Sequence, residues 1–410
     1  MDRLPGFRDF YPEPLPHPDV WSADARQYIF ERWRETARRY GFRPYDGPPL
    51  EPLELYTIKS GEEIVGQLYN FTDKGGRAVA LRPEMTPTLA RMIAAHERSY
   101  KKPIKWFAIP QLFRYERQQK GRLREHFQFN ADLLGEGGPG ADAEVIALLI
   151  DSLRAFGLTA ADFAVRLSSR NAWRDYFHRH SSKAEDEYAF FQAIDKLERE
   201  APEVNQAKLR ALGFELDEVR RFIQSGTPTA ELDAIIKDLR ARGLGDYAQI
   251  DYQVIRGLAY YTGVVFEAFD KKGAYRAIAG GGRYNNLVKL ISGGKADLPA
   301  LGFGMGDVVL LELLRERGLL PRWEGQIQAY CLIDNETLRE PSLDLVQHLR
   351  ESGFAVEFPL APAKADKQFK RALDLQAEFT FKLEASSQGG FDIQMKNLKT
   401  GEERILGPNS

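Results

Sequence analysis

The amino-acid sequence predicts an α+β protein that carries a helical insertion and ends in a small α/β domain. Residues 80–135 and 246–315 are rich in strand patterns, and glycines punctuate the second stretch. Between them, residues 170–245 change to short helical patterns, with few aromatic side chains after Phe191. After a Gly318–Pro321 breaker, strand and helix signals alternate. We therefore expect a first domain over 1–325, with the insertion inside it, and a second domain over 326–410.

Composition limits the class of protein. A chain of 410 residues with 43% hydrophobic side chains suits two or three domains with real cores, and its net charge of −2 leaves a local basic face possible. The single cysteine, Cys331, excludes an internal disulfide framework and a zinc knuckle, and it fits a reducing compartment. No apolar run is long enough to span a membrane, and the first residues lack the apolar core of a signal peptide. We expect a cytoplasmic protein without a membrane partner.

Two N-terminal stretches have helical signals. Residues 17–40 place Trp21, Ile29 and Trp33 at helical spacing, which predicts an amphipathic helix. In LRPEMTPTLARM, residues 81–92, the extended first part sets Arg82, Glu84 and Thr86 on one face before Pro87 opens a helix. This polar face has two interpretations: a binding surface, or a helix start that Thr86 caps.

The most informative stretch is FRYERQQKGRLREHFQFNADLLG, residues 113–135. Phe113 alternates with charged neighbours, and Gln128, Asn130 and Asp132 alternate with apolar residues further on, so the sequence predicts a hairpin with a basic tip and one polar face. A charged strand face is often only solvated. Amides and a carboxylate set between phenylalanines also suit a pocket for a small polar molecule.

The stretch that follows the insertion adds a third polar signal. QVIRGLAYYTGVVFEAF, residues 253–269, predicts a buried strand, and AIAGGGRYNNLV, residues 277–288, contains a glycine run that lets backbone approach a ligand or another strand closely. Arg256 and Arg283 each lie beside glycine and tyrosine. The glycine run alone is more typical of a turn, and it lacks the Lys-Ser/Thr of a phosphate-binding loop.

Together these segments resemble a known family. Residues 113–135 resemble motif 2 of class II aminoacyl-tRNA synthetases, and RGLAYYTGVVFEAF and AGGGRYNNLV resemble the two segments specific to histidyl-tRNA synthetases. LRPEMTPTLAR is similar to the amino-acid-binding segment of that family, LPGFRDFYPE to its N-terminal opening, and the 326–410 tail to its anticodon-binding domain. The resemblance covers nearly the whole chain in the order of the family.

The resemblance implies a class II antiparallel sheet flanked by helices, and a homodimer. It also implies histidine–tRNA ligase activity: ATP activates histidine to histidyl-adenylate, and the histidyl group passes to the 3′ end of tRNA(His). Asp132 and Tyr261 would bracket the imidazole, whose two ring nitrogens a carboxylate and a phenol can satisfy. The residues that the resemblance assigns to histidine are Glu84, Thr86, Arg114, Gln128, Asp132, Arg256, Tyr260 and Tyr261.

Arginines would serve the chemistry. The resemblance implies that Arg114 and Arg256 neutralise the reacting α-phosphate together with Mg²⁺ that accompanies ATP, with no protein-held metal site and no protein nucleophile. It assigns ATP to Arg114, Glu116, Arg122 and Arg283. Basic residues would meet tRNA phosphates, although a solvated helix face explains those of the tail equally well; they are Arg117, Lys120, Arg122 and Arg124 at the hairpin tip and Lys364, Lys367, Lys370 and Arg371 in the tail.

The sequence departs from the family pattern at two places. Ala259 stands where the family usually has an aspartate before the tyrosine pair. In LGFGMGDVVLLELL, Val308 and Val309 occupy the positions of the glutamate–arginine pair of motif 3. Either Arg283, Arg122 or another nearby arginine substitutes, which we expect, or activation is weakened. Two other functions stay open. One is a class II enzyme for another amino acid, and the other is the histidine-sensing regulatory subunit of ATP phosphoribosyltransferase, which resembles this catalytic domain but generally lacks an anticodon-binding tail.

Overall fold

The computed structural model describes residues 2–60, 62–115, 123–181, 183–197, 200–255, 260–273, 275–323, 327–387 and 389–407. The chain divides into two compact units, Met1–Leu320 and Pro321–Ser410, each of which has its own sheet. The expected division after residue 325 falls within 324–326, which lie outside the described residues. None of the described helices is long and apolar enough to cross a membrane.

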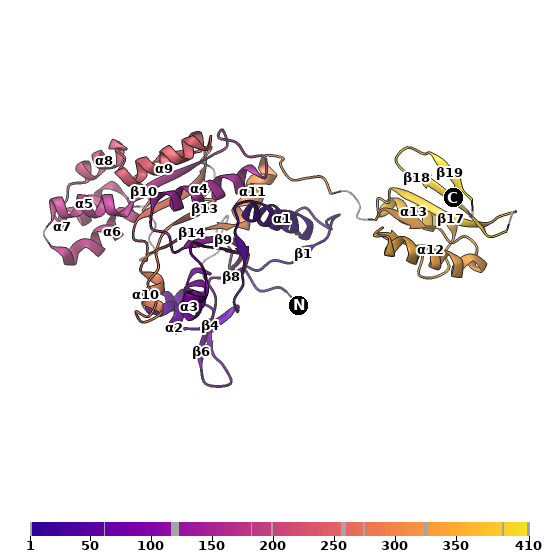
Figure 1. The fold of residues 1–410 in the computed structure, drawn as a ribbon, viewed down its shortest axis with the longest axis horizontal. Helices are drawn as coiled ribbons and strands as arrows, with labels where there is room; N and C mark the ends of the chain where they lie inside the picture. Colours follow the sequence, from indigo (N-terminus) through magenta and orange to yellow (C-terminus); the bar gives the residue numbers. More distant parts are fainter. Residues whose placement is uncertain are drawn as a thin grey trace. The chain divides into compact units, whose positions relative to one another are not determined.

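A large, mostly antiparallel sheet forms the centre of the first unit (Figure 1). Among its described strands, only the pairs β10–β11 and β3–β7 are parallel. The antiparallel α+β architecture expected from the sequence is therefore confirmed. The strand order is β11 (Ala248–Ile250), β10 (Phe163–Ser169), β12 (Val264–Asp270), β13 (Ala279–Arg283), β14 (Ala300–Gly306), β9 (Glu125–Leu134), β7 (Ile104–Ala108) and β3 (Arg43–Pro44), and β8 (Gln111–Phe113) pairs with the start of β9.

Helices α1 (Ala23–Arg39), α4 (Pro139–Arg154) and α11 (Asp307–Glu316) cover one face of this sheet (Figure 1). Helix α1 begins later than residue 17 because the side chain of Ser22 caps it by accepting a hydrogen bond from the backbone N–H of Ala25. Its fully buried Trp33 stacks on Phe129 of β9, with ring centroids 5.6 Å apart. The apolar alternate residues of β9 therefore face α1, and its polar alternate residues face the other side.

Helices α2 (Glu54–Ser60), α3 (Thr86–His96) and α10 (Leu287–Ile291) pack against one another. Beside them lies a small sheet of order β4 (Leu50–Pro52), β6 (Ala78–Leu81) and β5 (Asn70–Thr72). Near the N-terminus, β1 (Phe10–Tyr11) pairs with β2 (Trp21–Ser22). The 3₁₀ turns are η1 (Glu62–Gln67), η2 (Glu97–Ser99), η3 (Ala184–Asp186), η4 (Gly245–Tyr247) and, in the second unit, η5 (Glu336–Leu338).

The predicted insertion is helical. It follows β10 and ends before β11, and its core is aromatic: fully buried Trp173, Phe177 and Phe190 pack together. Its helices are α5 (Arg170–His180), α6 (Glu187–Asp195), α7 (Pro202–Ala211), α8 (Leu216–Ser225) and α9 (Ala230–Ala241), the last of which packs on α4.

The second unit is a five-stranded mixed sheet with two helices, as an α/β domain requires. Cys331 is fully buried in its core beside Val346 and Phe381, and burial raises the pKa of the thiol to about 12. The strand order is β16 (Val356–Glu357), β15 (Ala329–Cys331), β17 (Phe379–Ala385), β18 (Phe391–Asn397) and β19 (Glu403–Leu406), and the helices are α12 (Arg339–Glu351) and α13 (Ala365–Asp374).

Candidate functional site

A polar pocket lies on the face of the large sheet opposite α1. Residues from β9, β13, β14, the start of α3 and the segment before β12 form its walls. Among those foreseen from the sequence, all of the described histidine-site residues line it. The complete lining is Glu84, Thr86, Arg114, Gln128, Asn130, Asp132, Tyr260, Tyr261, Gly280, Tyr284, Gly302, Phe303 and Gly304.

The polar side chains of β9 lie over glycines of β14. Asp132 is paired with Gly302 in the antiparallel register, and a Cβ on that glycine would come to 2.0 Å from Oδ1 of Asp132. A Cβ on Gly304 would come to 2.6 Å from Cδ of Gln128. The alternation of glycine in LGFGMG therefore provides the space that the two site side chains occupy.

Asp132 lies at the buried end of the pocket. It is 3% exposed, and burial raises the pKa of its carboxyl to about 7. The hydroxyl of Tyr284 donates a hydrogen bond to Oδ1 of Asp132. The hydroxyl of Tyr45 is buried close by and has no hydrogen-bond partner within the described part of the chain. This end of the pocket combines a carboxylate with phenols that are shielded from solvent.

The tyrosine pair links this end to the other wall. Tyr261 is 6% exposed, and its ring packs against Tyr260, with centroids 4.8 Å apart. The hydroxyl of Tyr260 donates to Oε2 of Glu84 over 3.2 Å. Thr86 is the first residue of α3, and no side chain caps that helix. The interpretation of Thr86 as a cap is therefore wrong, and Thr86 lines the pocket instead.

Arg114 supplies a cation at the opposite wall. Its backbone N–H donates to the carbonyl of Arg124 over 2.9 Å, which continues the β8–β9 pairing toward the hairpin loop. Its Nε donates to the carbonyl of Pro83 over 3.1 Å, so the guanidinium is held beside the segment that carries Glu84. The hairpin predicted from the alternation of residues is present, and it carries Arg114, Gln128 and Asp132 into one pocket.

The assignment of Arg283 to ATP is wrong for this structure. Arg283 is 2% exposed, and its Nη2 donates to Oδ2 of fully buried Asp142 over 2.6 Å. The remaining donors reach the carbonyls of Glu136 and Gly138. A residue in a strand points to the face opposite its neighbour, so Arg283 points toward α4 while Tyr284 points into the pocket. Sequence reasoning chose the arginine and missed the tyrosine beside it.

The remaining predicted positions fall partly outside the described residues and partly at the start of α11. Glu116, Arg117, Lys120, Arg122 and Arg256 lie outside the described residues. At the start of α11, the valines that replace the motif 3 pair are buried, 5% exposed at 308 and 9% at 309. The glycines at 302 and 304 were also missed, although their alternation with large residues was visible in the sequence.

The pocket offers a distinct chemistry. A carboxylate and phenols at one end can bind both nitrogens of an imidazole, Glu84 can accept from an ammonium group, and Arg114 can neutralise a carboxylate or a phosphate. Within the described ranges, no three His, Cys, Asp or Glu side chains gather as metal ligands would. The pocket suits a small zwitterion with a polar ring next to an anionic group.

Comparisons with known proteins agree with this chemistry. The sequence model of the family "Histidyl-tRNA synthetase" matches residues 17–306. A histidine–tRNA ligase of Opitutus terrae is 45% identical, and the alignment covers 98% of this chain and 94% of that one. A histidine–tRNA ligase of Thermoplasma volcanium is 34% identical, with 99% and 96% covered. The crystal structure of the histidyl-tRNA synthetase from a Nostoc species superposes with a TM-score of 0.77 at 23% identity over 97% of this chain and 96% of that one, which establishes the fold.

Proposed function

The chain belongs to the histidyl-tRNA synthetase family, and from that premise we propose that it joins histidine to tRNA(His) through a histidyl-adenylate made from ATP. One observation carries the proposal: Asp132, Tyr261, Glu84 and Arg114 line a single pocket. A carboxylate and a phenol at its buried end match an imidazole, and a cation at the other wall matches the carboxylate that reacts.

Different side chains of the pocket bind different groups of the amino acid. Asp132 and Tyr261 bind the imidazole, and Glu84, Thr86 and Gln128 bind the α-amino group, with Tyr260 holding Glu84. An amino acid without ring donors and acceptors would leave buried Asp132 without a partner, which penalises wrong substrates. This accounts for selection of histidine over amino acids of similar size.

Activation needs positioning and charge neutralisation. The carboxylate of histidine attacks the α-phosphorus of ATP, the bond to the β-phosphate oxygen breaks, and pyrophosphate leaves with that electron pair. Arg114 draws the carboxylate and the α-phosphate together, and Arg256 is the second cation proposed there. Glu116 and Arg122 are proposed for the nucleotide. A ribose hydroxyl at the 3′ end of tRNA then attacks the carbonyl of the adenylate, and AMP leaves.

Magnesium is proposed only as the companion of ATP. Mg²⁺ commonly binds through substrate phosphates with few protein ligands, and there it would neutralise phosphate charge. We also propose a homodimer in the cytoplasm, and tRNA contacts by the hairpin tip and by the basic residues of the second unit, Lys364, Lys367, Lys370 and Arg371.

ATP–pyrophosphate exchange tests the proposal. We expect exchange that requires histidine and is lost in Arg256→Ala and Arg114→Ala, whereas an exposed control such as Arg3→Ala retains it. Histidine binding without exchange, together with stimulation of a phosphoribosyltransferase, would favour the regulatory subunit. Exchange with another amino acid would indicate a different class II specificity. The whole-length likeness to histidine–tRNA ligases, second unit included, supports the ligase.

A further inference from the structure

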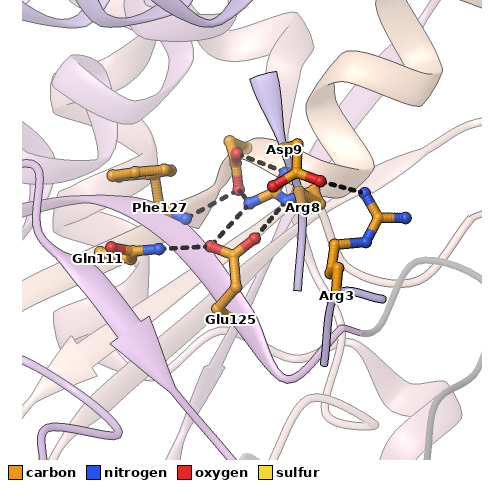
Figure 2. A network of polar contacts seen from close by, with 7 residues as sticks. Arg3, Arg8, Asp9, Gln111, Glu125 and Phe127 are labelled. Carbon is orange, nitrogen blue, oxygen red and sulfur yellow. Dashed lines mark hydrogen bonds and ion pairs between the residues drawn. The ribbon is translucent and has the colours of Figure 1, made fainter. Parts of the chain in front are cut away.

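Arg8, in the N-terminal segment, lies in a buried ion network (Figure 2). Its Nε donates to Oε1 of Glu125 over 2.6 Å, and its Nη1 donates to Oδ2 of Asp307 over 2.8 Å. All three side chains are at most 5% exposed. The guanidinium also lies over the ring of Trp21, 4.6 Å from its centroid. One cation therefore holds two buried carboxylates that would otherwise repel each other.

The network joins three separate parts of the first unit. Glu125 is the first residue of β9, and its Oε2 accepts from Nε2 of Gln111 in β8. Asp307 is the first residue of α11, and its Oδ1 accepts from the backbone N–H of Phe127 over 3.0 Å. Arg8 thus fixes both strands of the hairpin to the first turn of α11, the helix that lacks the motif 3 arginine.

Neighbouring N-terminal residues extend the attachment to the base of the hairpin loop. The backbone N–H of Arg124 donates to the carbonyl of Gly6 over 3.0 Å, and the ring of Phe7 packs on Phe113. We call residues 6–8 the N-terminal latch. The latch contacts β9 where Arg124 also pairs with Arg114, a pocket residue.

The latch lies nearer to one half of the site than to the other. Arg114, proposed to contact both the carboxylate of histidine and the α-phosphate, is one backbone pair from the network, and Gln128, proposed for the α-amino group, follows Phe127. Asp132 is seven residues beyond Glu125 on β9, which at about 3.4 Å per residue is roughly 24 Å along the strand. A displacement at Glu125 therefore moves Arg114 before it moves the imidazole end.

We propose that Arg8 is a positioning residue that sets the geometry of the nucleotide half of the site, through Glu125, Asp307 and the base of the hairpin. This inference rests on the proposed function, because the nucleotide half is assigned by it. Arg8 itself touches no substrate. Its donors are taken by carboxylates, and it acts on Arg114 through the backbone pair that Arg114 makes with Arg124. The mechanism is preorganisation: cations that await a triphosphate act well only when the elements that carry them are fixed.

Arg8→Lys tests the inference because it keeps the charge and removes the forked geometry. Calorimetry should show about tenfold weaker binding of ATP to the full-length variant, since small misplacements at such sites cost up to about 100-fold, and a smaller loss for histidine, which Asp132 and Tyr261 still hold at the far end. The matched control is Arg3→Ala, which removes an exposed ion pair with Asp9 in the same segment and should change neither constant. Equal losses for both ligands, or none for ATP, would overturn the inference.

A second variant guards against a folding defect. Glu125→Gln keeps the size and hydrogen-bonding capacity of the side chain and leaves Arg8 paired with Asp307. It should weaken ATP in the same direction, with the melting temperature measured alongside. If wild type binds both ligands but performs no histidine-dependent exchange, the proposed function fails. The binding constants of the variants then still test whether Arg8 positions the nucleotide half of the site. Wild type that bound no ATP would overturn both.

Discussion

Tyr284 donates a hydrogen bond to Asp132 at the buried end of the pocket, and both side chains are almost inaccessible to solvent. The bond occupies Oδ1 and fixes the direction of the carboxylate, so the remaining accepting capacity is oriented before a ligand arrives. Asp132 also lies against Gly302, and a Cβ at that position would collide with the carboxylate, so the glycine is what leaves room for this orientation. The histidine end of the site is therefore preorganised by residues that need not touch histidine.

Tyr284→Phe should weaken histidine selectively. Removing one donor from a buried carboxylate costs about 1–3 kcal/mol, so we expect histidine affinity to fall by about fivefold to 150-fold while ATP affinity stays within about twofold. Calorimetric titration of each ligand measures both values. Tyr40→Phe is the matched control, because it removes a hydroxyl that donates to Asp151, outside the pocket lining, and it should bind histidine as wild type does. Identical losses in the two variants would contradict the role of Tyr284.

Gly302→Ala should act on histidine through Asp132. The added methyl would come to 2.0 Å from Oδ1, so the carboxylate must move. We expect at least about tenfold weaker histidine and a smaller change for ATP, since displacements of this kind act locally. Gly140→Ala serves as control, because a Cβ there meets nothing within 4 Å. Unchanged histidine affinity in Gly302→Ala would show that the orientation of Asp132 is unimportant.

Histidine binding should depend on pH through Asp132. Burial raises the pKa of its carboxyl to about 7, so the accepting, ionised form becomes populated as the pH rises through neutrality. Affinity should therefore increase between about pH 6 and pH 8. Asp132→Asn removes the titrating group and leaves only the titration of histidine itself. A pH profile that the substitution does not flatten would assign the dependence to another group.

Arg283 should be a stability residue. Arg283→Met leaves Asp142 buried without its cation, which costs about 3–5 kcal/mol in comparable pairs. Urea unfolding should show this loss in the free energy of unfolding, whereas the fraction of the variant that is folded should keep its affinity for ATP. The double variant Arg283→Met with Asp142→Leu, which removes both charges, should recover part of the stability. Selective loss of ATP affinity without destabilisation would restore Arg283 to the nucleotide site.

The sequence predicted those parts of the site that follow from strand alternation. Gln128 and Asp132 share one face of β9 because alternate residues must, and Arg114 follows from the pairing of β8 with β9. The error at Arg283 has a physical cause: which face of a strand meets the pocket depends on packing against α4, which periodicity does not reveal. The pairing of Tyr284 with Asp132 joins residues far apart in the chain, and local patterns carry no information about it.

The same limit applies to the network of Arg8. Its partners, Glu125 and Asp307, come from two distant segments, and a charged residue near the N-terminus is ordinarily solvated. The architecture itself was predictable because glycine-punctuated strands and the change to helical periodicity at the insertion are local signals. The ion pairs between distant segments could not be predicted, because local patterns do not show which segments meet.

The account depends on a division of the pocket into a histidine end and a nucleotide end. Asp132→Ala, titrated separately with histidine and with ATP, tests this division most directly. We predict about 100-fold weaker histidine, as expected when a buried polar partner is lost, and ATP affinity within about twofold of wild type. Equal loss of both affinities would mean that Asp132 only supports the fold, and it would contradict the assignment of the site.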